Sequence, residues 1–75
     1  MLLNELKPGD NCVIEKLTGD NILKQRMMTM GIVPGVEISI LKYAPLGDPI
    51  EIKLKNCNLS LRLQEAATVC VSKIT

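Results

Sequence analysis

Three cysteines, Cys12, Cys57 and Cys70, are the residues of this chain best suited to metal or redox chemistry. Their number is odd, and no two are closer than 13 residues. Because zinc ribbons hold their metal with close Cys-x-x-Cys pairs, this spacing does not predict a zinc site. We expect reduced thiols that are buried as small apolar side chains, which fits a reducing cytosol. An intermolecular metal or disulfide is the alternative.

Histidine is absent, which excludes histidine triads, imidazole metal ligands and imidazole bases. The acidic residues, among them Asp10, Asp20 and Asp48, form no cluster with the spacing of metal ligands. No nucleophile, base and orienting group can be named together. The sequence therefore predicts neither an enzyme nor a chain that holds iron or another cofactor by itself. A metal carrier that uses the cysteines is an alternative, and equilibrium binding of ferrous iron or zinc to the reduced protein would distinguish it.

Arg26 and Arg62 are the only arginines. Arginine suits bidentate contacts to carboxylates, phosphates or backbone carbonyls. Each arginine could instead lie on a solvated face or form an internal ion pair with a glutamate. Arg62 could also join Lys42, Lys53 and Lys55 in a weakly basic strip across adjacent strands, which is either ordinary solvated surface or a docking surface for an acidic partner.

Binding to nucleic acid is not predicted. The formal net charge is +1, so no strong field attracts DNA, RNA or an anionic membrane. Tyr43 is the single aromatic residue, so no stacking platform for single strands exists. A nucleic-acid-binding small barrel is therefore the weaker alternative to a protein-binding module.

No targeting or membrane segment is expected. Met1-Leu2-Leu3 is followed at once by polar residues, so no apolar signal core forms. No apolar run approaches the ~20 residues that cross a bilayer. We expect a cytoplasmic protein without direct membrane insertion.

The spacing of apolar residues predicts one mostly β domain over residues 1–75, since a chain this short forms a single domain. Expected strands lie at residues 12–17, 36–40, 50–55, 57–63 and 68–72, with a helix at 22–30 and one helical turn at 64–67. Short strands at such spacing are typical of a small antiparallel barrel, here of about five strands with one short helix inserted between the first two. Directly after the strand at 36–40, Leu41 and Tyr43 would fall on the face opposite the core and need a second cover.

The helix is expected to stop at Gly31, which suits the left-handed position after a helix end. Ile32 would then contact Met27, the hydrophobic contact of a Schellman motif. Leu23, Met27 and Met30 share one helix face and would pack on the barrel. Pro34-Gly35 turns the chain after the helix.

The segment at residues 44–49, Ala-Pro-Leu-Gly-Asp-Pro, is the most suggestive surface. Its two prolines restrict the backbone, which lowers the entropy that binding would cost. Leu46 sits between them at a loop tip. It either folds back onto the barrel or projects as a contact residue for a partner.

The chain resembles the ferrous iron transport protein A (FeoA) family, which has an SH3-like barrel, over nearly its whole length. The resemblance rests on Leu6-Lys7-Pro8-Gly9, Arg26-Met27-Met28-Thr29-Met30-Gly31-Ile32-Val33-Pro34-Gly35, Ala44-Pro45-Leu46-Gly47-Asp48-Pro49-Ile50, Leu59-Ser60-Leu61-Arg62 and Glu65-Ala66. The Gly-x-x-Pro-Gly and Ala-Pro-Leu-Gly-Asp-Pro pieces at this separation are specific together. Met27 and Met28 depart mildly from the family pattern, in which leucines are common there.

The resemblance implies a cytoplasmic accessory protein of ferrous iron uptake that binds FeoB, a membrane permease with a GTP-binding domain. Similar barrels end the iron-dependent repressors, so a regulatory domain of that kind is the alternative; a chain of this length without DNA-binding helices fits a free-standing protein better. Weak self-association is a further expectation. The predicted partner-binding residues are Arg26, Tyr43, Ala44, Pro45, Leu46, Gly47, Asp48, Pro49 and Arg62.

Overall fold

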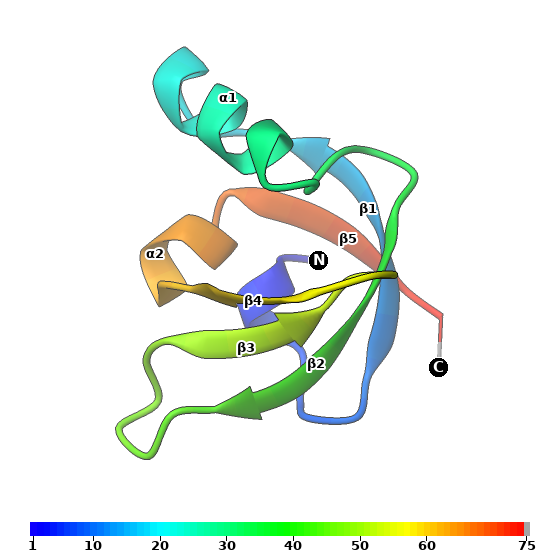
Figure 1. The fold of residues 1–75 in the computed structure, drawn as a ribbon, viewed down its shortest axis with the longest axis vertical. Coiled ribbons are helices and arrows are strands. Elements are labelled where there is room, and N and C mark those ends of the chain that lie inside the picture. Colours follow the sequence, from blue (N-terminus) through cyan, green and yellow to red (C-terminus); the bar gives the residue numbers. More distant parts are fainter. Residues whose placement is uncertain (75) are drawn as a thin grey trace.

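A computed structural model describes residues 1–74 and shows a curled, five-stranded antiparallel sheet with short helices beside it (Figure 1). The elements in chain order are η1 (Leu3–Glu5), β1 (Asn11–Leu17), α1 (Asn21–Thr29), β2 (Glu37–Tyr43), β3 (Ile50–Lys53), β4 (Asn58–Leu61), α2 (Leu63–Ala66) and β5 (Val69–Lys73). This confirms the predicted fold class, including the single helix between the first two strands and the helical turn before the last.

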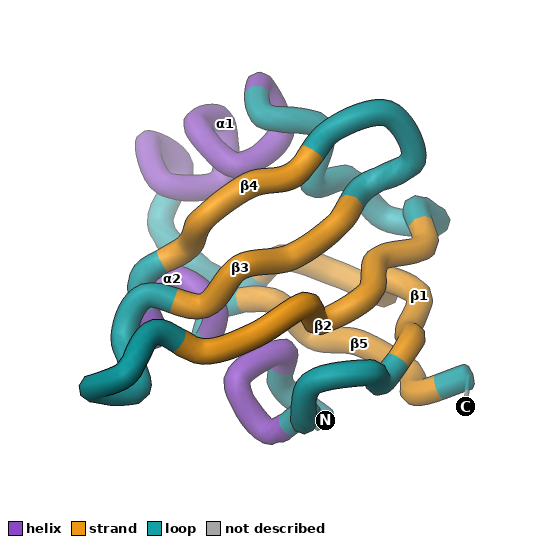
Figure 2. Tube along the Cα trace, turned by 60° about the horizontal axis from the view of Figure 1, so that its bottom comes forward, coloured by secondary structure: helices purple, strands orange, loops and turns teal. Residues whose placement is uncertain are grey.

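The strand order is β4-β3-β2-β1-β5, so β4 and β5 are the two ends of the sheet. The chain passes directly from one end to the other through α2. Figures 1 and 2 show both helices on the side of the molecule where these end strands lie. The helices thus cover an edge that would otherwise expose unpaired backbone groups.

Three strands differ clearly in length from the sequence-based expectation. The strands predicted at 50–55 and 57–63 are shorter. The chain turns between them, where Leu54 N–H donates to Cys57 C=O at 2.8 Å, and α2 begins at Leu63, soon after β4 ends. The strand predicted at 36–40 is longer and runs to Tyr43. Apolar and polar residues can go on alternating after a strand has ended in a turn. Alternation therefore predicts which face of a strand is buried better than it predicts where the strand ends.

A β-bulge in β2 changes the predicted position of Tyr43. Ile38 and Ile40 point into the core, and the register then shifts between Ile40 and Lys42. Leu41 is left exposed, whereas Tyr43 packs against the core and its hydroxyl donates to Leu6 C=O at 2.6 Å. The expectation that Leu41 and Tyr43 share a face is therefore wrong, because one extra residue restarts the alternation.

The core is almost entirely aliphatic, and no charged side chain of residues 1–74 is buried in it. Its members come from every strand and both α-helices: Leu3, Leu6, Cys12, Ile14, Met27, Ile32, Ile38, Ile40, Ile50, Ile52, Leu54, Leu61, Ala66, Val69 and Val71. Burial of these branched side chains is the main stabilising force in a domain without disulfides among its described cysteines.

Helix α1 begins and ends one residue earlier than the predicted range of 22–30. Asp20 caps the start, accepting the N–H of Leu23 at 2.8 Å. At the end Gly31 has a φ of +96°, and Ile32 N–H donates to Met27 C=O at 3.0 Å. Gly31 N–H donates to Met28 C=O, also at 3.0 Å. These two bonds confirm the Schellman motif.

Candidate partner-binding site

The loop between β2 and β3 presents one apolar side chain to solvent. Leu46 lies at its tip and is 97% exposed. The loop is closed by Ala44 N–H donating to Pro49 C=O at 2.9 Å, and by Gly47 N–H donating to Ala44 C=O at 2.7 Å. Gly47 adopts a φ of +89°, which suits glycine. The interpretation in which Leu46 folds back onto the barrel is therefore wrong, and the loop holds it outward.

A second contact ties this loop to α2. The Asp48 carboxylate accepts the N–H of Leu63 at 3.1 Å. Leu63 is the first residue of α2, where backbone N–H groups have no partner inside the helix. Through this hydrogen bond, Asp48 positions the loop that carries Leu46. The peptide bond between Asp48 and Pro49 is cis.

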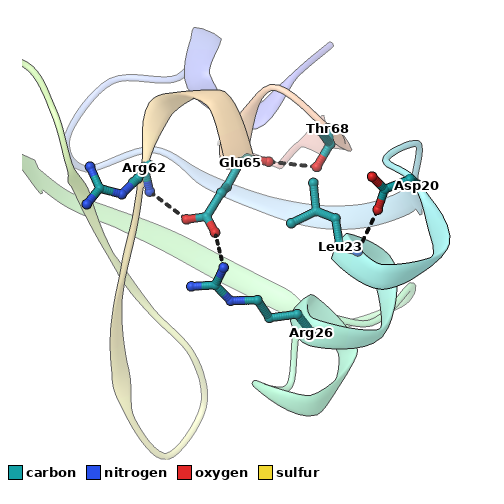
Figure 3. A network of polar contacts seen from close by, with 6 residues as sticks. All are labelled: Asp20, Leu23, Arg26, Arg62, Glu65 and Thr68. Atoms are coloured by element: carbon teal, nitrogen blue, oxygen red, sulfur yellow. Dashed lines mark hydrogen bonds and ion pairs between the residues drawn. The ribbon is translucent and has the colours of Figure 1, made fainter.

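Glu65 of α2 contacts both Arg26 of α1 and Arg62, the residue between β4 and α2, as Figure 3 shows. One carboxylate oxygen accepts the backbone N–H of Arg62 at 3.0 Å, and the other lies 3.5 Å from an Arg26 guanidinium nitrogen. The internal ion pair with a glutamate is therefore the arrangement that Arg26 adopts. Its contribution to stability is small, because the Arg26 side chain is 67% exposed and solvent screens the pair.

A pocket of about 250 Å³ forms where these elements meet. It is lined by Arg26, Pro49, Ser60, Arg62 and Glu65. The structure thus brings together three of the residues predicted for partner binding: Arg26 from α1, Pro49 from the loop, and Arg62, which lies between β4 and α2. Ser60 and Glu65 were not predicted. Glu65 could have been found from its place three residues after Arg62, the spacing of a capping box.

The remaining predicted features lie elsewhere or serve the fold. Tyr43 uses its hydroxyl internally, as described above. Burial and, to a smaller extent, the nearby charge of Asp10 raise the pKa of this hydroxyl. Lys42 pairs with Glu51 across the sheet at 3.5 Å. This pair neutralises one end of the predicted basic strip and leaves Lys53 and Lys55 as exposed lysines.

The cysteines have three different environments. Cys12 is buried, and burial together with the charge of Asp10 raises the pKa of its thiol to about 11. Cys70 is half-buried and Cys57 is exposed. The expectation of buried thiols is therefore wrong for Cys57, because this residue lies in the turn between β3 and β4 and not in the predicted strand. Within residues 1–74, no group of three or more Cys, Asp or Glu side chains is arranged to hold a metal ion.

In the described part of the chain, no helix has the length and apolar character to cross a membrane. The curled five-stranded sheet, the short helices and the rigid loop define a small SH3-like domain. The sequence matches the FeoA domain model over residues 1–73, so the chain belongs to the FeoA family.

Similar proteins agree with this family. The chain is 37% identical to the Fe(2+) transport protein A/Fe(2+) transporter FeoB fusion protein of Porphyromonas gingivalis, matching with its whole length but spanning only 9% of that protein. It is 35% identical to the FeoA protein of Chlorobium tepidum, whose solution structure superimposes with a TM-score of 0.93 and covers 100% of this chain and 71% of that one.

Two further structures extend the likeness of the fold. FeoA of Stenotrophomonas maltophilia, solved in complex with zinc and described as a prokaryotic SH3 domain protein, is 26% identical with a TM-score of 0.83, covering 96% of this chain and 89% of that one. A manganese-dependent transcriptional repressor has a TM-score of 0.90 at 15% identity over 97% of this chain and 40% of the repressor. At that identity the repressor shows a shared fold alone.

Proposed function

We propose that this chain is a cytoplasmic accessory domain of ferrous iron uptake that binds a FeoB-type permease through the loop at residues 44–49. The observation that carries the proposal is the 97% exposure of Leu46 on a loop held by its own hydrogen bonds and by Asp48. An exposed leucine on a rigid loop loses little entropy on binding and gains free energy when a partner covers it.

The choice of partner is supported by the Porphyromonas gingivalis relative, whose name joins the transport protein A and FeoB in one chain. Fusion raises the effective concentration of one part around the other, which favours parts that bind each other. Docking on such a permease would hold the domain at the inner face of the membrane without inserting it.

The test compares two exposed apolar residues. Leu46→Glu should abolish capture of the purified cytoplasmic region of the FeoB-type permease and impair ferrous iron uptake in a strain that lacks this protein. Ile22→Glu is the matched control, because Ile22 is 83% exposed but lies on α1. Wild-type capture and uptake by Leu46→Glu would overturn the proposal, as would equal losses in both variants.

A further inference from the structure

The pocket beside the loop contains more positive than negative charge. Its charged lining consists of Arg26, Arg62 and Glu65. Glu65 is already engaged, since one oxygen accepts the Arg62 backbone N–H and the other faces Arg26. Neither contact uses the guanidinium of Arg62, and Figure 3 shows this side chain pointing away from Glu65. The N–H groups of the Arg62 guanidinium are therefore available to donate hydrogen bonds to a ligand.

The size of the pocket limits what it can receive. Its volume of about 250 Å³ is below the ~300–1,000 Å³ of sites that enclose a small-molecule ligand or cofactor. One acidic side chain fits such a space, which is too small to enclose a nucleotide. Arginine presents its donors in a planar fork that matches both oxygens of a carboxylate.

The charge of the pocket favours a carboxylate over a phosphate. Two arginines and one glutamate leave a single excess positive charge. A carboxylate carries one negative charge and balances it. A phosphate dianion would exceed it and leave a net negative charge, and Glu65 on the same wall would repel a dianion more strongly than a carboxylate.

Pro49 places this pocket next to Leu46. Pro49 is both the end of the Leu46 loop and part of the pocket wall. We propose that the pocket receives a glutamate or aspartate side chain of the protein partner that covers Leu46. The inference rests on the proposed function for the identity of that partner. It adds an anionic residue, held by Arg62 and neighbouring Arg26, beside the apolar contact.

The first experiment measures the affinity of the permease cytoplasmic region for three variants by calorimetry. Arg62→Gln should weaken binding roughly tenfold, because the partner's carboxylate loses its charged donor. Arg62→Lys should recover part of the affinity, since it restores the charge without the fork. Lys55→Gln is the control for net charge and should bind as the wild type does. All three should melt at the wild-type temperature, because neither Arg62 nor Lys55 forms an ion pair within residues 1–74.

The outcomes separate the two proposals. Loss of binding in Leu46→Glu with wild-type affinity in Arg62→Gln would overturn the carboxylate pocket and leave the proposed function standing. Equal weakening in Arg62→Gln and Lys55→Gln would also overturn the pocket, because only net charge would then matter.

A second experiment needs no permease. Titration of the protein with glutarate, followed by the NMR signals of the arginine Nε–H groups, should shift the signals of Arg62 and Arg26. The shifts should be absent at Arg26 in Arg62→Gln and unchanged in Lys55→Gln. No shift with glutarate would overturn the inference, and so would a larger shift with inorganic phosphate at the same concentration.

Discussion

The carboxylate of Asp48 accepts the backbone N–H of Leu63 at 3.1 Å and so joins the exposed loop to the start of α2. Asp48→Ala should lower the free energy of unfolding by about 1 kcal/mol, because a helix-start N–H loses its charged acceptor. Asp48→Asn keeps an acceptor oxygen and should cost less. Urea denaturation measures both changes.

Amide exchange provides the local control for this prediction. In Asp48→Ala the Leu63 amide should exchange faster, while the Leu23 amide stays as slow as in the wild type. In Asp20→Ala the pattern should reverse, because Asp20 caps α1 through Leu23. Identical exchange of Leu63 in Asp48→Ala and wild type would show that the hydrogen bond does not hold the loop.

Gly31 is predicted to be required for its backbone conformation. A Cβ at this position would meet only Leu54 Cδ1, at 3.5 Å, which is an ordinary contact. The cost of Gly31→Val therefore comes from the φ of +96° and should be on the order of 1 kcal/mol or more. In a domain of this size ~1 kcal/mol lowers the melting temperature by ~4–8 °C.

Gly31→Asn is the matched variant, since asparagine tolerates the left-handed region better than other residues. Its melting temperature should lie between those of Gly31→Val and the wild type. Equal melting of all three proteins would contradict the assignment of the helix end.

Leu46 and Leu61 should differ sharply in their effect on stability. Leu46 is 97% exposed, so Leu46→Ala should change the free energy of unfolding by less than ~0.5 kcal/mol. Leu61 is 1% exposed in β4, so Leu61→Ala should cost ~2–5 kcal/mol. Chemical denaturation of the two variants measures the difference. A large loss in Leu46→Ala would place that side chain in the core.

The thiols should react in the order of their exposure. Iodoacetamide should modify Cys57 first, then Cys70, and Cys12 last, because Cys12 is buried and its pKa is raised to about 11. Mass spectrometry of digested protein at successive times measures the order. Early labelling of Cys12 would show that the fold opens around β1.

The raised pKa of Cys12 also predicts a pH dependence of stability. A folded-state pKa above the ordinary value of 9.0 means that folding favours the neutral thiol. Its contribution to stability is complete below pH 9 and is lost as the pH rises through about 11. Tyr43 titrates in the same direction, so the comparison is between the wild type and Cys12→Ala, which share Tyr43. The free energy of unfolding should fall less between pH 8 and pH 11 in Cys12→Ala.

Features encoded within a few neighbouring residues could be predicted from the sequence alone. The end of α1 follows from Gly31 and the apolar residues around it, because only a local left-handed turn lets the last carbonyls find donors. The tight loop around Leu46 follows from two prolines and a glycine that confine the chain to a turn, but whether Leu46 folds back or projects was decided only by the structure. The five strands follow from alternation, although their ends do not.

The candidate site depended on contacts between residues that are distant in the chain. The residues next to Arg26 in the sequence do not indicate that it will form an ion pair with Glu65. Nor do they indicate that Pro49 and Arg62 will line the same pocket. The bulge after Ile40 likewise reverses the direction of Tyr43, because register is set by pairing with β3. The sequence determined the local elements and the loop that carries Leu46. The packing of α1 and α2 beside the two end strands decided which charged side chains line the pocket at Pro49, since only tertiary contacts bring separate segments within a few ångströms.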